Sequence, residues 1–544
     1  MELLRRVSRE QNALMFFQKY FRYIVIALLA LLYLGSVWQR PLYIDTEFRQ
    51  AEIAREMTAT APMPGFCGEL LPGEPPLVHW VNAAVMALTG EQPAAVRLAG
   101  ALATLLTAGV IFLLGRRSGV PRLAEAAALV WLFSAAVFAA GTSGGGDALF
   151  VFFNTLTLAM FFFVATESAL ARRCAYLVLC GVGWALAMLC RGAEALPMAV
   201  IPAAVFLVWR KEWKSLLVLP WIPLAVAALI VAGCAMACRV NLMEWFPFPP
   251  EAAGGGTFPL AWLILPFAGT LPWILFLPMV WHGYRIDFAG AGKISLLRFA
   301  LSMLLMGVVV PFFPAGGAAF RFLPCLPAAA ILFAFGMLRA SDRGDYWWVN
   351  RVMNLLVWCL LPFPLLLFLL QTLAKFTRRV PSELVVYRFH ENYYLPVVAL
   401  MVMVIWFRMA SREPGGARKF GCFCVGLAFL FLSAPVSMPW RFVRDFAPEA
   451  FLRQVAVPRA AGDTAVLANG SLRAAAAWTL KRNDVGTLEA VSVNGGVMEL
   501  PRDRGLLVIT DNEAQVRRMP APKTTYRAGG VFVVHYPGSS GGAK

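Results

Sequence analysis

The sequence is poor in charged residues. Only 15% of its 544 residues are Asp, Glu, Lys or Arg, whereas 60% are hydrophobic. Soluble globular domains carry about 25% charged residues, so this composition excludes an ordinary soluble protein. The mean hydropathy of +0.67 supports the same conclusion. The chain is therefore expected to be a membrane protein.

Several familiar site motifs are also missing. The four histidines are scattered and the ten cysteines form no CxxC pair, which argues against a zinc site and a disulfide framework. No GxGxxG or GxxxxGK[ST] sequence follows a predicted strand, so a nucleotide site is not expected. The net charge of +17 comes from short Lys/Arg clusters between apolar runs. Such clusters form no continuous basic face, so nucleic acid is not an expected partner.

Long apolar runs are what the sequence has in abundance. Thirteen runs between residues 23 and 436 are long enough to cross about 30 Å of hydrocarbon, and no small-residue cleavage site follows the first. If the N-terminus is cytoplasmic, every inside loop carries two or more Lys/Arg, as the positive-inside rule requires. The predicted fold is an all-α polytopic membrane protein with about 13 transmembrane helices, over residues 1–436.

The tail over residues 437–544 then lies outside, on the side of the membrane opposite the cytoplasm. Its segments DTAVLANGSLRAAAAWTLKRN and GLLVITDNEAQVRRM each read as a strand, a turn and a helix, and GGVFVVHY reads as a closing strand. This pattern predicts a small C-terminal α/β periplasmic domain.

The first outer loop, residues 39–97, is predicted to carry amphipathic helices. The stretch DTEFRQAEIAREM has apolar positions that do not make a full spanning face, so it is expected to lie on the membrane. Its residues Glu52, Arg55 and Glu56 are expected to form a solvated face. A second segment, PPLVHWVNAAVMALTG, places His79 and Trp80 at the interface.

Polar groups at membrane level are costly and are therefore functional candidates. Asp147 follows three glycines at the mouth of the fourth span, and Arg191, Glu194 and Arg321 lie in later outer loops. Each has a simpler interpretation, because Asp147 could be a helix N-cap and the arginines could extend to the interface. Separated carboxylates and arginines on one side together point to an anionic, lipid-linked ligand at the outer leaflet.

The same residues carry a family resemblance. The stretches DTEFRQAEIAREM and GEPPLVHWVNAAVMALTG resemble the first outer loop of the bacterial protein O-mannosyltransferase superfamily, most closely the aminoarabinose transferases that modify lipid A. Further similar segments follow in order over nearly the whole chain: GGGDALFVFFNTLTLAMFFF, LAMLCRGAEALPM, GTLPW and FRFLPCLPAAAILFA. The resemblance implies a C-type glycosyltransferase fold and a sugar donor on a polyprenyl phosphate.

An inverting transfer needs a carboxylate to take the proton from the acceptor hydroxyl and cations beside the departing phosphate. The catalytic candidates are Asp45, Glu47 and Asp147. The phosphate-binding candidates are Arg49, Arg191 and Arg321. Glu74, His79 and Trp80 are assigned to the acceptor or donor loop. The resemblance implies no certain cofactor, and a divalent metal ion is left open.

The sequence departs from the family pattern at several positions, among them the short fourth outer loop, which lacks the family's His. The family's paired Asp-Glu falls on Thr46 and Glu47, so the catalytic carboxylate is either Asp45, one residue early, or Glu47. The family's Lys before Pro-Pro is replaced by Glu74, and Arg321 could return the lost cation.

The expected partners are a polyprenyl-phosphate-linked sugar, a lipid or glycan acceptor and membrane lipids, with the protein a monomer in the inner membrane. A catalytically impaired homologue that binds lipid-linked sugar stays an alternative. A lipid-linked sugar transporter is a further one, although the mid-span charges and similar halves it would need are not found.

Overall fold

The structure is a computed structural model of the 544-residue chain. It describes residues 29–38, 41–42, 45–59, 63–71, 73–245, 269–284, 291–309, 322–342, 347–362, 369, 394–412, 416–436, 448–460, 464–470, 472–481, 486–487, 505–519, 523–528 and 531–537.

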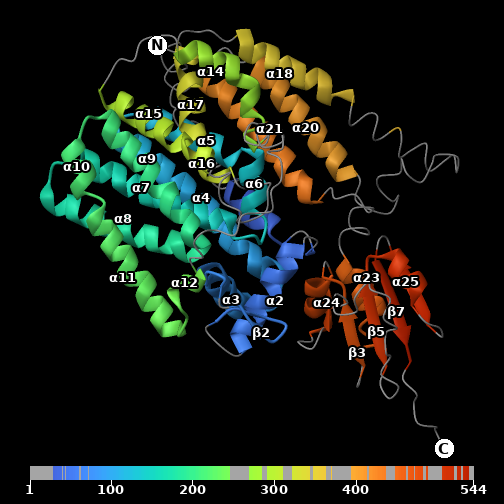
Figure 1. Ribbon diagram of the computed structural model, residues 1–544. Helices are drawn as coiled ribbons and strands as arrows, with labels where there is room; N and C mark the ends of the chain where they lie inside the picture. Colours follow the sequence, from blue (N-terminus) through green and yellow to red (C-terminus); the bar gives the residue numbers. More distant parts are fainter. Residues whose placement is uncertain are drawn as a thin grey trace, which may run out of the picture.

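The first part of the chain forms a bundle of apolar helices (Figure 1). Its elements are α4 (Pro93–Arg117), α5 (Pro121–Leu132), α6 (Ala135–Gly141), α7 (Asp147–Thr166), α8 (Leu170–Arg191), η1 (Gly192–Glu194), α9 (Ala195–Trp209), α10 (Trp213–Val218), α11 (Trp221–Cys238) and α12 (Leu242–Trp245). A second group continues it with η2 (Trp273–Phe276), α14 (Leu277–Tyr284), α15 (Ala291–Leu304), α16 (Met306–Val309), η5 (Leu323–Cys325), α17 (Leu326–Asp342), α18 (Trp347–Leu360), α20 (Tyr394–Arg412) and α21 (Gly416–Val436).

Among the described residues, four helices are long and apolar enough to cross a membrane. These are Pro93–Arg117, Asp147–Thr166, Leu170–Trp209 and Trp221–Cys238, and α5 with α6 would make a fifth as a pair bent by 66°. The mostly helical, membrane-type architecture is therefore confirmed. The count of thirteen spans stays a prediction.

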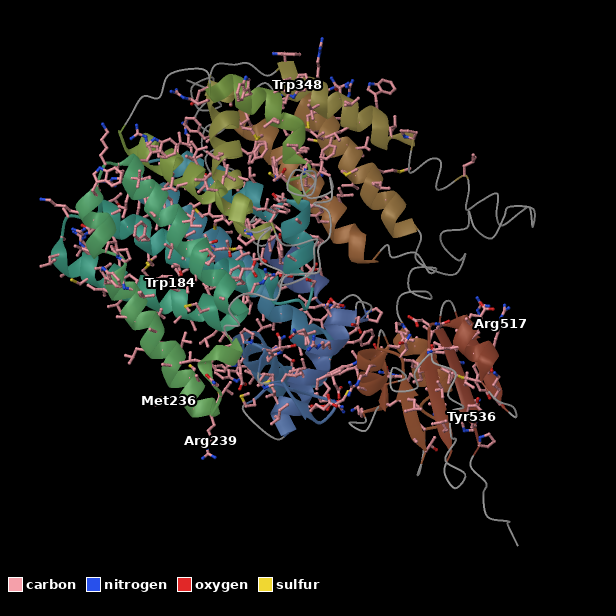
Figure 2. The ribbon with its side chains drawn as sticks, in the orientation of Figure 1. Trp184, Met236, Arg239, Trp348, Arg517 and Tyr536 are labelled. Atoms are coloured by element: carbon pink, nitrogen blue, oxygen red, sulfur yellow. The ribbon has the colours of Figure 1, made fainter. Side chains whose placement is uncertain are left out.

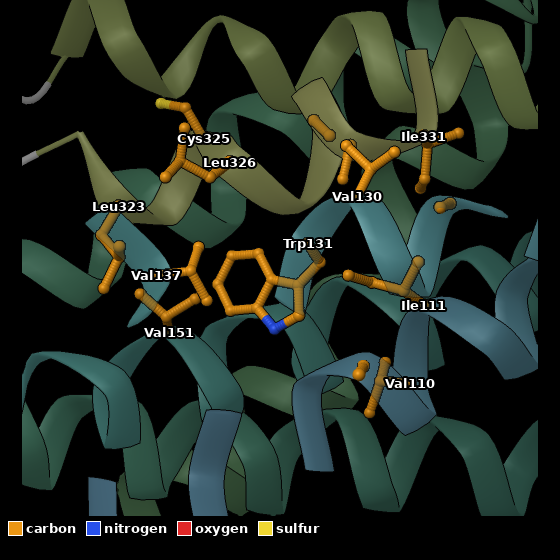
Figure 3. Close-up of a cluster of buried hydrophobic side chains, with 14 of the residues drawn as sticks. Val110, Ile111, Val130, Trp131, Val137, Val151, Leu323, Cys325, Leu326 and Ile331 are labelled. Atoms are coloured by element: carbon orange, nitrogen blue, oxygen red, sulfur yellow. The ribbon is translucent and has the colours of Figure 1, made fainter. Parts of the chain in front are cut away.

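The core of the bundle holds α4, α5 and α7 in fixed positions. Trp131 of α5 is 1% exposed and donates its indole N–H to the carbonyl oxygen of Thr104 on α4 at 3.0 Å. Val110, Val137 and Leu323 are among the apolar side chains that surround it (Figure 3). Burying such side chains stabilises the folded state by about 1.5–3 kcal/mol each in water; inside a membrane, close packing takes over that role. This packing fixes the N-terminal ends of α4 and α7, which carry Arg97 and Asp147.

The outer loop folds into α2 (Asp45–Ala59), a hairpin of β1 (Gly65–Phe66) and β2 (Glu69–Leu70), and α3 (Leu77–Thr89). The two strands pair in antiparallel fashion. The prediction of a solvated face on α2 is wrong. Glu52 is fully buried and bonds Arg55, whereas the Glu56 carboxylate accepts the backbone N–H of Gly68 at 3.3 Å. This face of α2 is covered because α3, the hairpin and α24 pack against the helix.

The C-terminal elements form a five-stranded sheet with flanking helices (Figure 1). They are α23 (Pro448–Val455), β3 (Ala465–Ala468), α24 (Arg473–Leu480), β4 (Gly486–Thr487), β5 (Leu506–Thr510), α25 (Glu513–Arg518), β6 (Thr524–Ala528) and β7 (Val531–Tyr536). The strand order is β4-β3-β5-β7-β6, with β3 parallel to β4 and β5, and β7 antiparallel to β5 and β6. β3 with α24, β5 with α25, and β7 lie in the segments predicted for them, whereas α23, β4 and β6 were not predicted. The domain boundaries at 436 and 437, and the periplasmic side, stay predictions.

The sheet docks on the outer loop through α24. One apolar cluster contains Phe48, Ala51 and Ala54 of α2 together with buried residues of α24, β5 and β7. Figure 1 shows α24 beside α2. Figure 2 shows Trp348 and Arg239 at opposite ends of the helical part, with the C-terminal sheet toward the Arg239 end. The outer loop and the C-terminal elements are thus packed as one region at one end of the bundle.

Candidate active site

Glycines allow three loops to meet at this end of the bundle. Gly146, directly before α7, has a φ of 74°, and a Cβ atom there would lie 2.7 Å from Val78 of α3. Gly192, after α8, has a φ of 64°, and its Cβ would lie 2.5 Å from the carbonyl oxygen of Trp245. Larger residues would be strained in this backbone region and would push the loops apart. The glycines therefore let α3, α7 and α8 bring their polar residues together.

Asp45 is the first residue of α2 and is exposed. Within the described part of the chain, its carboxylate makes no hydrogen bond or ion pair. Partial burial raises its pKa above that of an ordinary aspartate, against the opposing charge of Arg49. A carboxylate with free oxygens and a raised pKa is suited to accept a proton.

Glu47 has the opposite environment. Its side chain is fully buried, and its two oxygens accept bonds from Arg97 Nε at 2.9 Å and Nη2 at 2.6 Å. The same carboxylate accepts the backbone N–H of Gly144 at 3.3 Å. Arg97, also fully buried, donates to the carbonyl oxygen of Pro41 at 2.8 Å. Glu47 thus joins the outer loop to α4 and to the glycine loop before α7.

Asp147 and Arg191 form an ion pair between the start of α7 and the end of α8. The N-cap position belongs to Gly146, and the Asp147 side chain makes no capping bond. The interpretation of Asp147 as an N-cap is therefore wrong. Arg191 also donates to both carboxylate oxygens of Glu194 at 3.3 Å, and its guanidinium carbon lies 5.1 Å from the centre of the Phe150 ring. Asp147 and Arg191, which the sequence analysis placed in separate loops, are therefore in contact.

Arg49, Glu74 and His79 make a second polar cluster. Glu74 accepts from Arg49 Nη2 and lies 3.1 Å from His79 Nε2. Burial raises the pKa of Glu74, but the bond to His79 and the charge of Arg49 outweigh it and lower the pKa below its usual value. The Nδ1 atom of buried His79 has no hydrogen-bond partner among the described residues. Trp80, the remaining residue assigned to this loop, is half-buried.

The two clusters approach each other where Pro75 meets Gly192, the residue after Arg191. Pro75 lies beside Glu74, and its Cγ would be 3.6 Å from a Cβ atom added at Gly192. Arg321 lies outside the described residues, so its predicted role as a further cation stays a prediction. Over the described part of the chain, no three His, Cys, Asp or Glu residues are placed to hold a metal ion.

Arg97 was missed by the sequence analysis. It lies inside α4 between apolar neighbours, in the sequence AAVRLAG. A charged residue at that depth needs an opposite charge or backbone carbonyls as partners. That signal pointed to a buried ion pair, although the identity of the partner depends on the tertiary fold.

Residues 73–237 match the family described as dolichyl-phosphate-mannose-protein mannosyltransferase. The chain is 28% identical over 476 residues to an undecaprenyl phosphate-alpha-4-amino-4-deoxy-L-arabinose arabinosyl transferase from Shewanella sediminis, covering 84% of this chain and 83% of the relative. It is 27% identical over 483 residues to the transferase of the same name from Edwardsiella ictaluri, covering 84% of each chain.

Two solved structures show the same fold. The crystal structure of apo ArnT from Cupriavidus metallidurans matches with a TM-score of 0.73 and 17% identity, covering 97% of this chain and 100% of that one. The structure of the same protein bound to undecaprenyl phosphate gives 0.70 and 17%, covering 96% and 99%. Together these similarities confirm the predicted resemblance of the chain to the bacterial protein O-mannosyltransferase superfamily, with aminoarabinose transferases among its relatives.

Proposed function

We propose that the chain is an integral membrane glycosyltransferase that moves a sugar from a polyprenyl phosphate to a periplasmic acceptor. The observation that carries this proposal is the exposed Asp45 carboxylate, one helical turn from Arg49. It lies on the helix whose Glu47 bonds the glycine loop before Asp147, the partner of Arg191. A base and cations on adjoining loops are what transfer from a lipid phosphate requires. The similarity to transferases named for undecaprenyl phosphate supports the donor class.

The reaction is an inverting displacement at the anomeric carbon. The acceptor hydroxyl oxygen attacks that carbon, and the bond from the carbon to the phosphate oxygen breaks. Asp45 accepts the hydroxyl proton. The departing lipid phosphate gains negative charge, which Arg49 and Arg191 stabilise through charge-assisted hydrogen bonds. Arg321 is proposed as a third cation.

The remaining polar residues orient these groups. Glu74 and His79 hold the Arg49 side chain, and Asp147 with Glu194 holds Arg191. Glu47 fixes the segment that carries Asp45. This assigns Glu47 a structural role, which leaves Asp45 as the proposed base.

The donor and the acceptor are to be tested by reconstitution. The relatives' substrate makes undecaprenyl phosphate-4-amino-4-deoxy-L-arabinose the first donor to try, with lipid A as the first acceptor and other glycans or protein after it. Purified protein in vesicles should release undecaprenyl phosphate and yield a glycosylated acceptor, both followed by mass spectrometry. Binding of the donor without transfer to any acceptor would instead favour a catalytically impaired homologue.

The activity should fall at acidic pH because Asp45 acts as a base. Transfer is present above the pKa of Asp45 and is lost as the pH falls through it, because the protonated carboxyl cannot accept a proton. Since this pKa is raised, the loss of activity should begin at a higher pH than an ordinary aspartate would give. The lowered pKa of Glu74 keeps its bond to Arg49 intact over this range. The profile of kcat/KM against pH checks this. A profile without an acid limb that depends on Asp45 would contradict the assignment.

We also propose a monomer in the bacterial inner membrane, with about thirteen spans, a cytoplasmic N-terminus and residues 437–544 in the periplasm. Alkaline phosphatase fused after Lys544 should then be active, because this enzyme folds only in an oxidising compartment. A cytoplasmic reporter at the same position should be silent. The reverse result would overturn the topology and place the site on the wrong side for a periplasmic acceptor.

A further inference from the structure

The hairpin of β1 and β2 contacts residues of both the candidate site and α24. Phe66, in β1, has two guanidinium groups near its ring. The guanidinium carbon of Arg49 lies 5.8 Å from the ring centre and that of Arg473 lies 5.3 Å from it. Arg49 belongs to α2 and the candidate site, whereas Arg473 is the first residue of α24. One aromatic ring therefore connects a site cation to the C-terminal part of the chain.

Arg473 is fixed on this hairpin by further contacts. Its Nη2 atom lies 3.7 Å from Glu69 Oε1 in β2, and its side chain is 20% exposed. Behind it, the buried alanines of α24 pack in the same apolar cluster as Ala51 and Ala54 of α2. The hairpin is thus held from the side of the C-terminal sheet by charge, ring contact and close packing.

We infer that Arg473 is a positioning residue for the transfer reaction, acting through Phe66 on the guanidinium of Arg49. This inference rests on the proposed function, in which Arg49 binds the donor phosphate. The face of an aromatic ring attracts cations, so Phe66 and Glu74 together set the direction in which the remaining N–H groups of Arg49 point. The C-terminal sheet thereby takes part in donor binding without touching the donor.

The same interface offers a matched control. Lys481, just after the other end of α24, pairs at 2.7 Å with Glu91, which lies between α3 and α4 and not in the hairpin. Lys481→Gln removes an ion pair between the same two parts of the chain but leaves Phe66 and Arg473 unchanged. Weaker docking of the C-terminal sheet would follow from either substitution. A change in donor binding through Arg49 would follow only from the substitution of Arg473.

The experiment measures the donor KM, kcat and the binding of undecaprenyl phosphate with the full-length protein in vesicles. Arg473→Gln and Phe66→Leu should each raise the donor KM and weaken lipid phosphate binding by roughly fivefold to tenfold. They should also lower kcat, because Arg49 stabilises the charge that develops on the departing phosphate. Arg473→Lys, which keeps a cation for the ring, should restore most of the affinity. Lys481→Gln should match the wild-type protein, and melting temperatures should show that every variant is folded.

A double-mutant cycle tests whether Arg473 acts through Arg49. In an Arg49→Gln background, Arg473→Gln should have no further effect on the donor KM, because the residue through which it acts is gone. Additive effects, or an equal change with Lys481→Gln, would overturn the inference while leaving the proposed function intact. If the wild-type protein neither bound undecaprenyl phosphate nor transferred a sugar, the proposed function itself would fail, and the inference with it.

Discussion

Replacing Asp45 by Asn should lower kcat/KM for sugar transfer by about two orders of magnitude or more, because the acceptor proton then has no base at the site. The substitution changes the size of the side chain very little, and Asp45 makes no hydrogen bond or ion pair within the described residues, so the melting temperature should stay close to that of the wild-type protein. Transfer from a polyprenyl-phosphate sugar in vesicles, normalised to the amount of folded protein, measures the effect.

Glu47→Gln is the matched comparison, two residues along the same helix. The buried guanidinium of Arg97 would lose its counter-charge, which costs about 3–5 kcal/mol for a buried pair. This variant should therefore unfold at a lower temperature, and its loss of activity should follow its loss of folded protein. If Asp45→Asn kept wild-type transfer while folded Glu47→Gln protein lost it, the base would be Glu47 and the present assignment would be reversed.

The contrast between these two acids shows what the sequence could not decide. Asp45 and Glu47 are both carboxylic acids in the same segment. The family's register pointed to Glu47 and its residue type to Asp45, so the sequence left both as candidates. Their environments differ because Arg97, fifty residues later in α4, reaches Glu47. Local sequence carries no information on such a contact, since only the packed bundle sets the distance between the two side chains.

Long-range packing also explains the wrong prediction for α2. The segment was expected to be a helix, and α2 is one, but the burial of Glu52 and Glu56 comes from neighbours in the hairpin, in α3 and in α24. By contrast, the gathering of Asp147 and Arg191 was predictable. Charged residues at membrane level must find partners, and the loop count placed both on the same side of the bundle.

Asp147→Asn is the second substitution from which a loss of about two orders of magnitude is expected. The amide has no charge to pair with Arg191, so the guanidinium can turn to Glu194 and away from the phosphate. The effect on the fold should be smaller than that of Glu47→Gln, because the nearly buried guanidinium of Arg191 keeps Glu194 as a counter-charge. Gly146 already occupies the N-cap position, and a lost charge in the first turn costs about 0.3–1 kcal/mol of helix stability. A hundredfold loss of rate corresponds to about 2.7 kcal/mol, so the two effects can be told apart.

A double-mutant cycle with Arg191→Gln determines whether the pair acts as a unit. If Asp147 works by holding Arg191, the double variant should be no slower than Arg191→Gln alone, because the positioning partner has nothing left to position. Independent losses that multiply would mean that Asp147 contacts the substrate itself, as a second carboxylate beside Asp45. Wild-type transfer by Asp147→Asn would contradict both roles and would reduce the carboxylate to a favourable charge at the N-terminus of α7.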